Sequence, residues 1–219
     1  MTLAGVDLEA SWRETARRAG LAEAQAEAVF QDLCRRYSEP QRAYHDLSHV
    51  AAMLNTVAPF AETVRDPAAL HLAIWFHDAV YDARSKDNEE ESAALAASAL
   101  SSAGVTQATG DRVTRLIFAT KTHQVCREDL DCQLLLDADL AILGTPPEEY
   151  DSYAQAIRRE YEWVGEADYR AGRARVLRGF LERDRLYGTE ALFAALEGPA
   201  RANLQREITW LTPPTSEIT

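Results

Sequence analysis

The chain has 219 residues, a length that suits one large domain or two small ones. Hydrophobic residues make up 47% and charged residues 26%, as in an ordinary globular protein, and 35 acidic against 23 basic residues give a net charge of −12. This acidity argues against nucleic acids and anionic membranes as partners, because both carry negative charge.

Helix signals follow one another along the whole chain, and alternating strand patterns are scarce. Helices are expected at 8–19, 22–37, 47–60, 66–81, 88–103, 111–120 and 131–143, from 145–146 onward, and at 167–183 and 189–206. The strongest start is Asp66-Pro67, since aspartate caps helices and proline suits their first turn. We therefore predict an all-α fold of roughly ten helices in a single domain, 1–211, with a flexible C-terminal tail, 212–219.

The cysteines and the apolar segments indicate where in the cell the protein is located. Cys34, Cys126 and Cys132 form a sparse, odd-numbered set, which fits reduced thiols better than a disulfide framework. No apolar run approaches ~18 residues, and residues 1–20 lack the pattern of a signal peptide. The sequence thus predicts a soluble cytoplasmic protein.

Histidine and aspartate side chains recur where a helical core would exclude them. His77 and Asp78 adjoin each other in an apolar stretch, and His49 lies near the start of the preceding predicted helix. Antiparallel packing of those two helices would bring His49 and His77 to the same end, whereas His71 is out of phase and is read as structural. Asp139 lies in another apolar helix, where a carboxylate is costly unless it binds something. His49, His77, Asp78 and Asp139 form a mixed ligand set that suits one divalent ion, with Mn, Fe, Co, Ni, Zn and Mg as candidates.

The order His49…His77-Asp78…Asp139 resembles the H…HD…D pattern of the HD superfamily. The flanking segments 42–49, 76–82, 86–93, 136–144, 158–161 and 172–187 are similar to a small bacterial branch known as predicted metal-dependent HD phosphohydrolases. The resemblance spans about 37–206 and implies an all-helical metal-dependent phosphohydrolase.

The last aspartate of the family pattern falls on Asp139 or, as the alternative, on Asp137. The two side chains would point to roughly opposite faces of a helix, ~200° apart. Many HD proteins place the ligand directly before a leucine, which favours Asp139 over Asp137. Asp137 would then orient a histidine or a water molecule.

Two further histidines lie near the predicted ligands. His45 precedes His49 by four residues, and a substrate-binding role and a plain loop or cap role both fit it. His123 lies in a polar loop, where it would act in substrate binding or proton transfer, bind the metal, or be a solvated loop residue. HD branches that hold two metal ions carry several histidines in this interval, so one histidine favours a single ion.

Several charged side chains near the ligands suit a phosphorylated substrate. Arg42, Lys86 and Lys121 are the predicted substrate-binding cations, although each also fits an ordinary surface role. Glu89 and Glu90 read as a charge run at a helix start, and the resemblance makes one of them a candidate base or water-positioning group.

The leading hypothesis is hydrolysis of a phosphate ester or anhydride of a small metabolite or nucleotide. Asp78, Glu89 or Glu90 would accept the proton of the attacking water, and His123 is a further candidate catalytic residue. Two other hypotheses are an iron oxygenase of the HD type, which needs more ligands, and a non-catalytic binding protein whose metal only holds the helices. The sequence leaves the substrate and the oligomeric state open.

Overall fold

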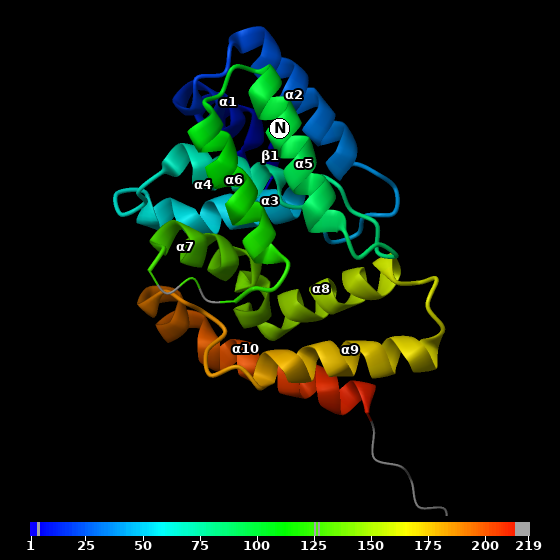
Figure 1. Cartoon of the computed structure of the whole chain (residues 1–219). Coiled ribbons are helices and arrows are strands. Elements are labelled where there is room, and N and C mark those ends of the chain that lie inside the picture. Colours follow the sequence, from blue (N-terminus) through cyan, green and yellow to red (C-terminus); the bar gives the residue numbers. More distant parts are fainter. Residues whose placement is uncertain (4, 125, 127, 213–219) are drawn as a thin grey trace, which may run out of the picture.

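The computed structural model describes residues 1–3, 5–124, 126 and 128–212 as a helical protein (Figure 1). Within these residues there are ten α-helices, two short 3₁₀ helices and one two-stranded hairpin, so the predicted all-α fold is confirmed. The elements are β1 (Thr2–Leu3), β2 (Val6–Asp7), α1 (Leu8–Ala19), α2 (Glu23–Tyr37), α3 (Leu47–Val57), η1 (Ala58–Phe60), α4 (Pro67–Phe76), α5 (Asn88–Ser102), α6 (Gln107–Thr120), α7 (Leu130–Asp139), η2 (Ala141–Gly144), α8 (Pro147–Glu160), α9 (Glu166–Leu181) and α10 (Glu190–Leu211).

Short polar side chains fix where many of the helices begin. The helices α1, α3, α4, α6, α7 and α10 each follow an aspartate or threonine whose side chain accepts a hydrogen bond from a backbone N–H of the first turn. Asp66 caps α4 in this way, with Pro67 in the first turn, as expected from the sequence. These caps satisfy N–H groups that would otherwise have no partner.

The helix predicted to run to Tyr81 ends at Phe76 instead, and this prediction was wrong. Side chains from elsewhere hold the backbone that follows. The Ser92 hydroxyl bonds both the N–H and the carbonyl of Val80, at 3.0 and 3.2 Å, and Arg42 donates to the carbonyl of Asp78 at 2.7 Å. The His77-Asp78 pair therefore lies in a turn at the helix end, not within a helix.

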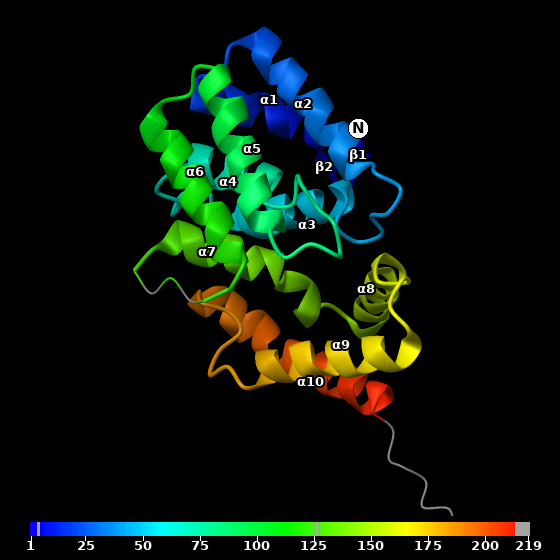
Figure 2. The ribbon, with the colours of Figure 1, turned by 45° about the vertical axis from the view of Figure 1, so that its right-hand side comes forward.

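The helices form two groups, α1–α7 and α8–α10 (Figures 1 and 2), and each group has its own hydrophobic core. The first is built from α1–α7, with Trp12 and Trp75 edge to face at its centre, their ring centroids 5.5 Å apart. The second is built from η2 and α8–α10. Ala138 belongs to the first core and Leu140 to the second, so Asp139 lies where the two meet.

The close approach of η2 to α10 requires a glycine at position 144. A β-carbon on Gly144 would lie 2.7 Å from Leu196 Cβ and 3.0 Å from its carbonyl oxygen. We expect Gly144→Ala to lower the free energy of unfolding by about 2 kcal/mol, because the backbone must shift to make room. Urea denaturation measures the loss. Gly110→Ala in α6 is the control: a β-carbon there meets nothing within 4 Å, so no loss is expected.

The cysteines differ from the prediction of reduced thiols. Cys126 and Cys132 form a disulfide, with Cα atoms 6.0 Å apart, while Cys34 is a half-buried free thiol. The chain before α7 folds back against that helix, where Gln133 Nε2 donates to the Cys126 carbonyl at 2.8 Å, and this brings the two sulfurs together.

The described helices include none that is both long and apolar enough to cross a membrane. Of the predicted C-terminal tail, only Thr212 is described, and its N–H bonds the Ile208 carbonyl at 2.9 Å. The rest of the tail, 213–219, lies outside the described residues.

Candidate metal centre

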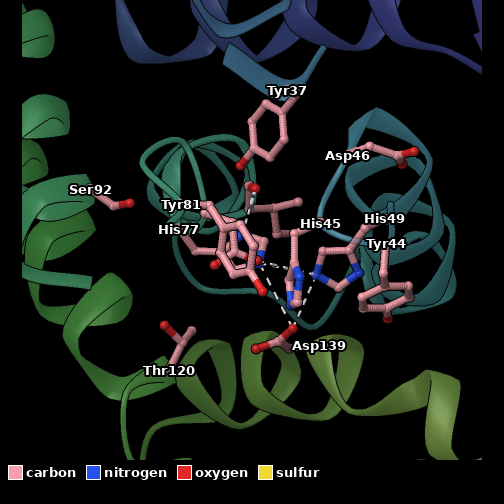
Figure 3. A network of polar contacts seen from close by, with 12 residues as sticks. Tyr37, Tyr44, His45, Asp46, His49, His77, Tyr81, Ser92, Thr120 and Asp139 are labelled. Carbon is pink, nitrogen blue, oxygen red and sulfur yellow. Dashed lines mark hydrogen bonds and ion pairs between the residues drawn. The ribbon is translucent and has the colours of Figure 1, made fainter. Parts of the chain in front are cut away.

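Three helix ends bring four ionisable side chains together between the two cores, and Figure 3 labels three of them, His49, His77 and Asp139. His49 comes from the first turn of α3, His77 and Asp78 follow α4, and Asp139 ends α7. The Nε2 atoms of His49 and His77 are 3.1 Å apart. Asp139 Oδ1 is 3.1 Å from His49 Nε2, and Asp78 Oδ2 is 3.0 Å from His77 Nε2.

These atoms fit a divalent ion. His49, His77 and Asp139 each offer one ligand atom, all within 4.8 Å of one another, so the three residues could hold a metal. Ligands about 2.1 Å from an ion lie about 3.0 Å apart when they are neighbours in an octahedral shell, close to the spacings of this cluster. His77 Nδ1 donates to the Ile74 carbonyl at 3.0 Å, so Nε2 is the ring atom that would ligate an ion, after losing its proton.

The electrostatics of the cluster favour a cation. Burial raises the pKa of Asp78 and of Asp139, but neighbouring histidines outweigh it and hold both below the usual range for aspartate. Burial lowers the pKa of His77, yet Asp78 and Asp139 raise it to about 9. Both carboxylates are therefore ionised at neutral pH, and negative charge lies beside both imidazoles.

Asp137 faces away from the cluster. Its Oδ1 accepts from the N–H of Gly188 at 2.6 Å, and its Oδ2 accepts from the N–H and hydroxyl of Thr189 at 2.8 and 2.6 Å. The carboxylate therefore anchors the start of α10, which corrects both roles considered for Asp137, as a metal ligand and as a group that orients a histidine or water. Asp139 is the aspartate of this helix that lies with the histidines.

His123 lies against the outer oxygen of Asp139. Its Nε2 is 2.7 Å from Asp139 Oδ2, so it orients the carboxylate and is not a solvated loop residue. The backbone of His123 has a φ of 47°, a left-handed conformation that is costly for a residue with a side chain. Arg183 holds it there by donating to the carbonyls of Thr122 and His123 at 3.2 and 2.9 Å.

His45 is held beside the cluster by Glu160, a residue that the sequence analysis missed. Glu160 Oε2 bonds His45 Nδ1 at 2.7 Å and the Tyr81 hydroxyl at 2.8 Å. Its Oε1 accepts from the consecutive N–H groups of Ala43, Tyr44 and His45 at 2.8, 2.8 and 3.0 Å. A plain loop role for His45 does not account for this arrangement.

The surroundings of Glu160 keep it ionised. Burial raises its pKa, but the hydrogen bond from His45 and those from the backbone outweigh burial and bring the pKa to about 2. A signal was present in the sequence: Glu160 follows Ile157 by one helical turn, which places a carboxylate on the apolar stripe of α8.

Arg42 does not face a substrate, in contrast to its predicted role. Its side chain is fully buried and donates to the carbonyls of His45, Asp78 and Ala79 at 2.9, 2.7 and 3.2 Å. Arg42 therefore joins the turn that carries Asp78 to the turn that carries His45. Nearness in sequence to the predicted ligands suggested a substrate contact, whereas the side chain turns inward.

The charged residues 86–90 and Lys121 form a second group. Lys121 pairs with Glu90, has Glu89 Oε2 at 3.9 Å, and donates to the Lys86 carbonyl at 2.8 Å. The bond from Lys121 lowers the pKa of Glu90. Lys86, Glu89 and Lys121 line the same cavity as the metal cluster, whereas Glu90 is turned toward the lysine.

This cavity, of about 950 Å³, lies between the two cores. One end contains the cluster residues Asp78 and Asp139 with His45 and His123, and α8 and α9 form the other wall. A buried, anionic set of potential metal ligands thus opens into a space large enough for a small organic molecule.

No family model, no curated protein and no solved structure matches this chain.

Proposed function

We propose that the protein is a metal-dependent phosphohydrolase. The observation that carries the proposal is the convergence of two buried imidazoles on two carboxylates, Asp78 and Asp139, that line a cavity together with Lys86 and Lys121. Metal ligands and cations side by side suit a phosphate group, which binds to both. The resemblance of the sequence to HD phosphohydrolases points to the same reaction.

The ligands of the proposed ion are His49, His77 and Asp139, with Asp78 beside His77. A divalent ion held there would lower the pKa of a bound water and polarise a phosphoryl oxygen.

The remaining polar groups of the cavity have separate roles. Lys86 offsets the charge of the phosphoryl oxygens, and Lys121 adds to it by exchanging its exposed contact with Glu90 for the phosphate. Glu89, which also faces the cavity, takes the proton of the attacking water. His45, with Nδ1 bound to Glu160, has Nε2 available to give a proton to the leaving oxygen.

The test is phosphate release from a panel of phosphomonoesters and anhydrides by protein supplied in turn with Mn²⁺, Fe²⁺, Co²⁺, Ni²⁺, Zn²⁺ and Mg²⁺. We expect turnover that a chelator abolishes and that His77→Gln lowers by about 1000-fold, because the variant loses an imidazole ligand. His71→Gln is the matched control, since His71 lies on α4, the helix that ends just before His77, and outside the cavity. The activity of His71→Gln should equal that of the wild type. If His77→Gln were as active as His71→Gln, the proposal would be contradicted.

A further inference from the structure

The cavity is polar at one end and apolar at the other. The metal cluster, Lys86 and Lys121 lie at the polar end. The opposite wall is formed by η2, α8, α9 and the turn between the last two. Its apolar and aromatic side chains include Ile142, Tyr153, Tyr161, Val164, Val176 and Phe180. A ligand that fills the cavity therefore touches both kinds of surface.

Part of this wall is open to solvent. Ile142, Tyr161, Val164 and Phe180 pack on the second core and remain only partly buried, and Val176 is 53% exposed. Apolar side chains that are grouped and accessible beside polar groups are typical of ligand grooves.

The buried cation of this wall already has its partner. Arg173 has a side chain that is 9% exposed and forks onto Glu207, with Nε to Oε1 at 2.9 Å and Nη2 to Oε2 at 3.1 Å. Its Nη1 lies 3.4 Å from the Tyr153 hydroxyl. Glu207 neutralises Arg173, and the other charged side chains of this wall, Asp168 and Arg175, carry opposite charges. This end of the cavity therefore has no net positive charge that would favour a second anionic group on the ligand.

The aromatic wall begins at the metal cluster itself. The ring of Tyr44 lies 4.9 Å from that of His49 and 4.6 Å from that of Tyr153, measured between centroids. Tyr44 and Tyr153 thus form a continuous aromatic surface that leads from the cluster toward the far wall, along which the organic group of a bound phosphate ester could extend.

We propose that the substrate is a phosphomonoester whose organic group is apolar, an alkyl or aryl group that lies against the η2–α8–α9 wall. This inference rests on the proposed function, and it adds the class of the leaving alcohol. Burial of the apolar group supplies affinity at the wall, while the phosphate is recognised at the cluster and the lysines.

Gly172 offers a way to block the wall without disturbing the fold. It lies on α9, lines the cavity, and has nothing within 4 Å of the position of a β-carbon. A phenylalanine there would extend into the space of the organic group. Gly179, also on α9 with nothing within 4 Å, does not line this cavity, so Gly179→Phe is the matched control.

The experiment compares ethyl, butyl, hexyl and octyl phosphate, whose leaving alcohols have nearly equal intrinsic reactivity. The value of kcat/KM for each ester is measured with protein that has been supplied with the ion that gives the fastest phosphate release. Calorimetry measures the affinity of the same protein for the corresponding alkylphosphonates. We expect kcat/KM and phosphonate affinity to rise by up to about fourfold per added methylene, as the free energy of burying one CH₂ gives. In Gly172→Phe this rise should disappear, and in Gly179→Phe it should persist.

The outcomes separate the two proposals. If the rate of hydrolysis does not depend on chain length, or if Gly172→Phe leaves that dependence unchanged, the apolar substrate class is wrong. The proposed phosphohydrolase function is not affected by either result. Failure to hydrolyse any ester with any of the six ions overturns the proposed function and this inference with it.

Discussion

Replacement of Asp139 by asparagine is expected to remove metal binding and to lower phosphate release by about 1000-fold or more. The amide keeps the size of the side chain but loses the negative charge that lies 3.1 Å from His49 Nε2 and 3.8 Å from His77 Nε2. Hard divalent ions depend on anionic oxygen ligands, so the neutral side chain loses most of the affinity. Calorimetric titration with Mn²⁺ and a rate assay measure the two effects.

Asp137→Asn is the matched control for this variant. Asp137 lies two residues earlier on α7 and bonds Gly188 and Thr189, outside the cluster. The control should bind metal as the wild type does while losing about 2 kcal/mol of stability, since an amide satisfies only part of those bonds. Metal affinity that falls in Asp137→Asn and persists in Asp139→Asn would reverse the assignment of the two aspartates.

The second large effect is expected for Glu160→Gln, which should lower the free energy of unfolding at neutral pH by about 3 kcal/mol. The difference between the pKa of about 2 in the folded protein and the ordinary value near 4.5 corresponds to that amount. A depressed carboxyl pKa stabilises the fold fully above the unfolded value, near pH 4.5, and the contribution is lost as the pH falls toward 2. The difference in free energy of unfolding between the wild type and Glu160→Gln should therefore shrink as the pH falls from 4.5 to 2.

Urea denaturation from pH 7 down to pH 2 measures this difference. Glu162→Gln is the control, because Glu162 is exposed and lies two residues beyond Glu160. Glu162→Gln should have the same free energy of unfolding as the wild type at every pH. A constant difference between Glu160→Gln and the wild type across the window would show that the charge of Glu160 does not stabilise the fold.

The helices could be predicted because their signals are local. Apolar spacing and, for α4, the Asp66-Pro67 cap placed the starts of α1, α3 and α4 at the observed residues. The end of α4 was missed because tertiary contacts from Arg42 and Ser92 hold the backbone after Phe76, and these cannot be read from the apolar run 73–81. Tertiary contacts override local preference at such a point.

The cluster could be predicted in part for a similar reason. His49, His77 and Asp139 stand out because ionisable side chains in apolar helices need a partner. The choice between Asp137 and Asp139 could not be made from periodicity, because both carboxylates have partners inside the protein: Asp137 bonds Gly188 and Thr189, and Asp139 lies beside His49. The role of Glu160 depends on backbone N–H groups more than 100 residues away in sequence, and only the fold brings them together.

The metal content of the protein, purified without added metal or chelator and measured by inductively coupled plasma mass spectrometry, tests the central assignment most directly. We predict about one equivalent of a divalent metal per chain, or uptake of one equivalent on titration, and its loss in Asp139→Asn. A wild-type protein that contains no metal and takes up none of the six ions would contradict the assignment of His49, His77 and Asp139 as a metal centre.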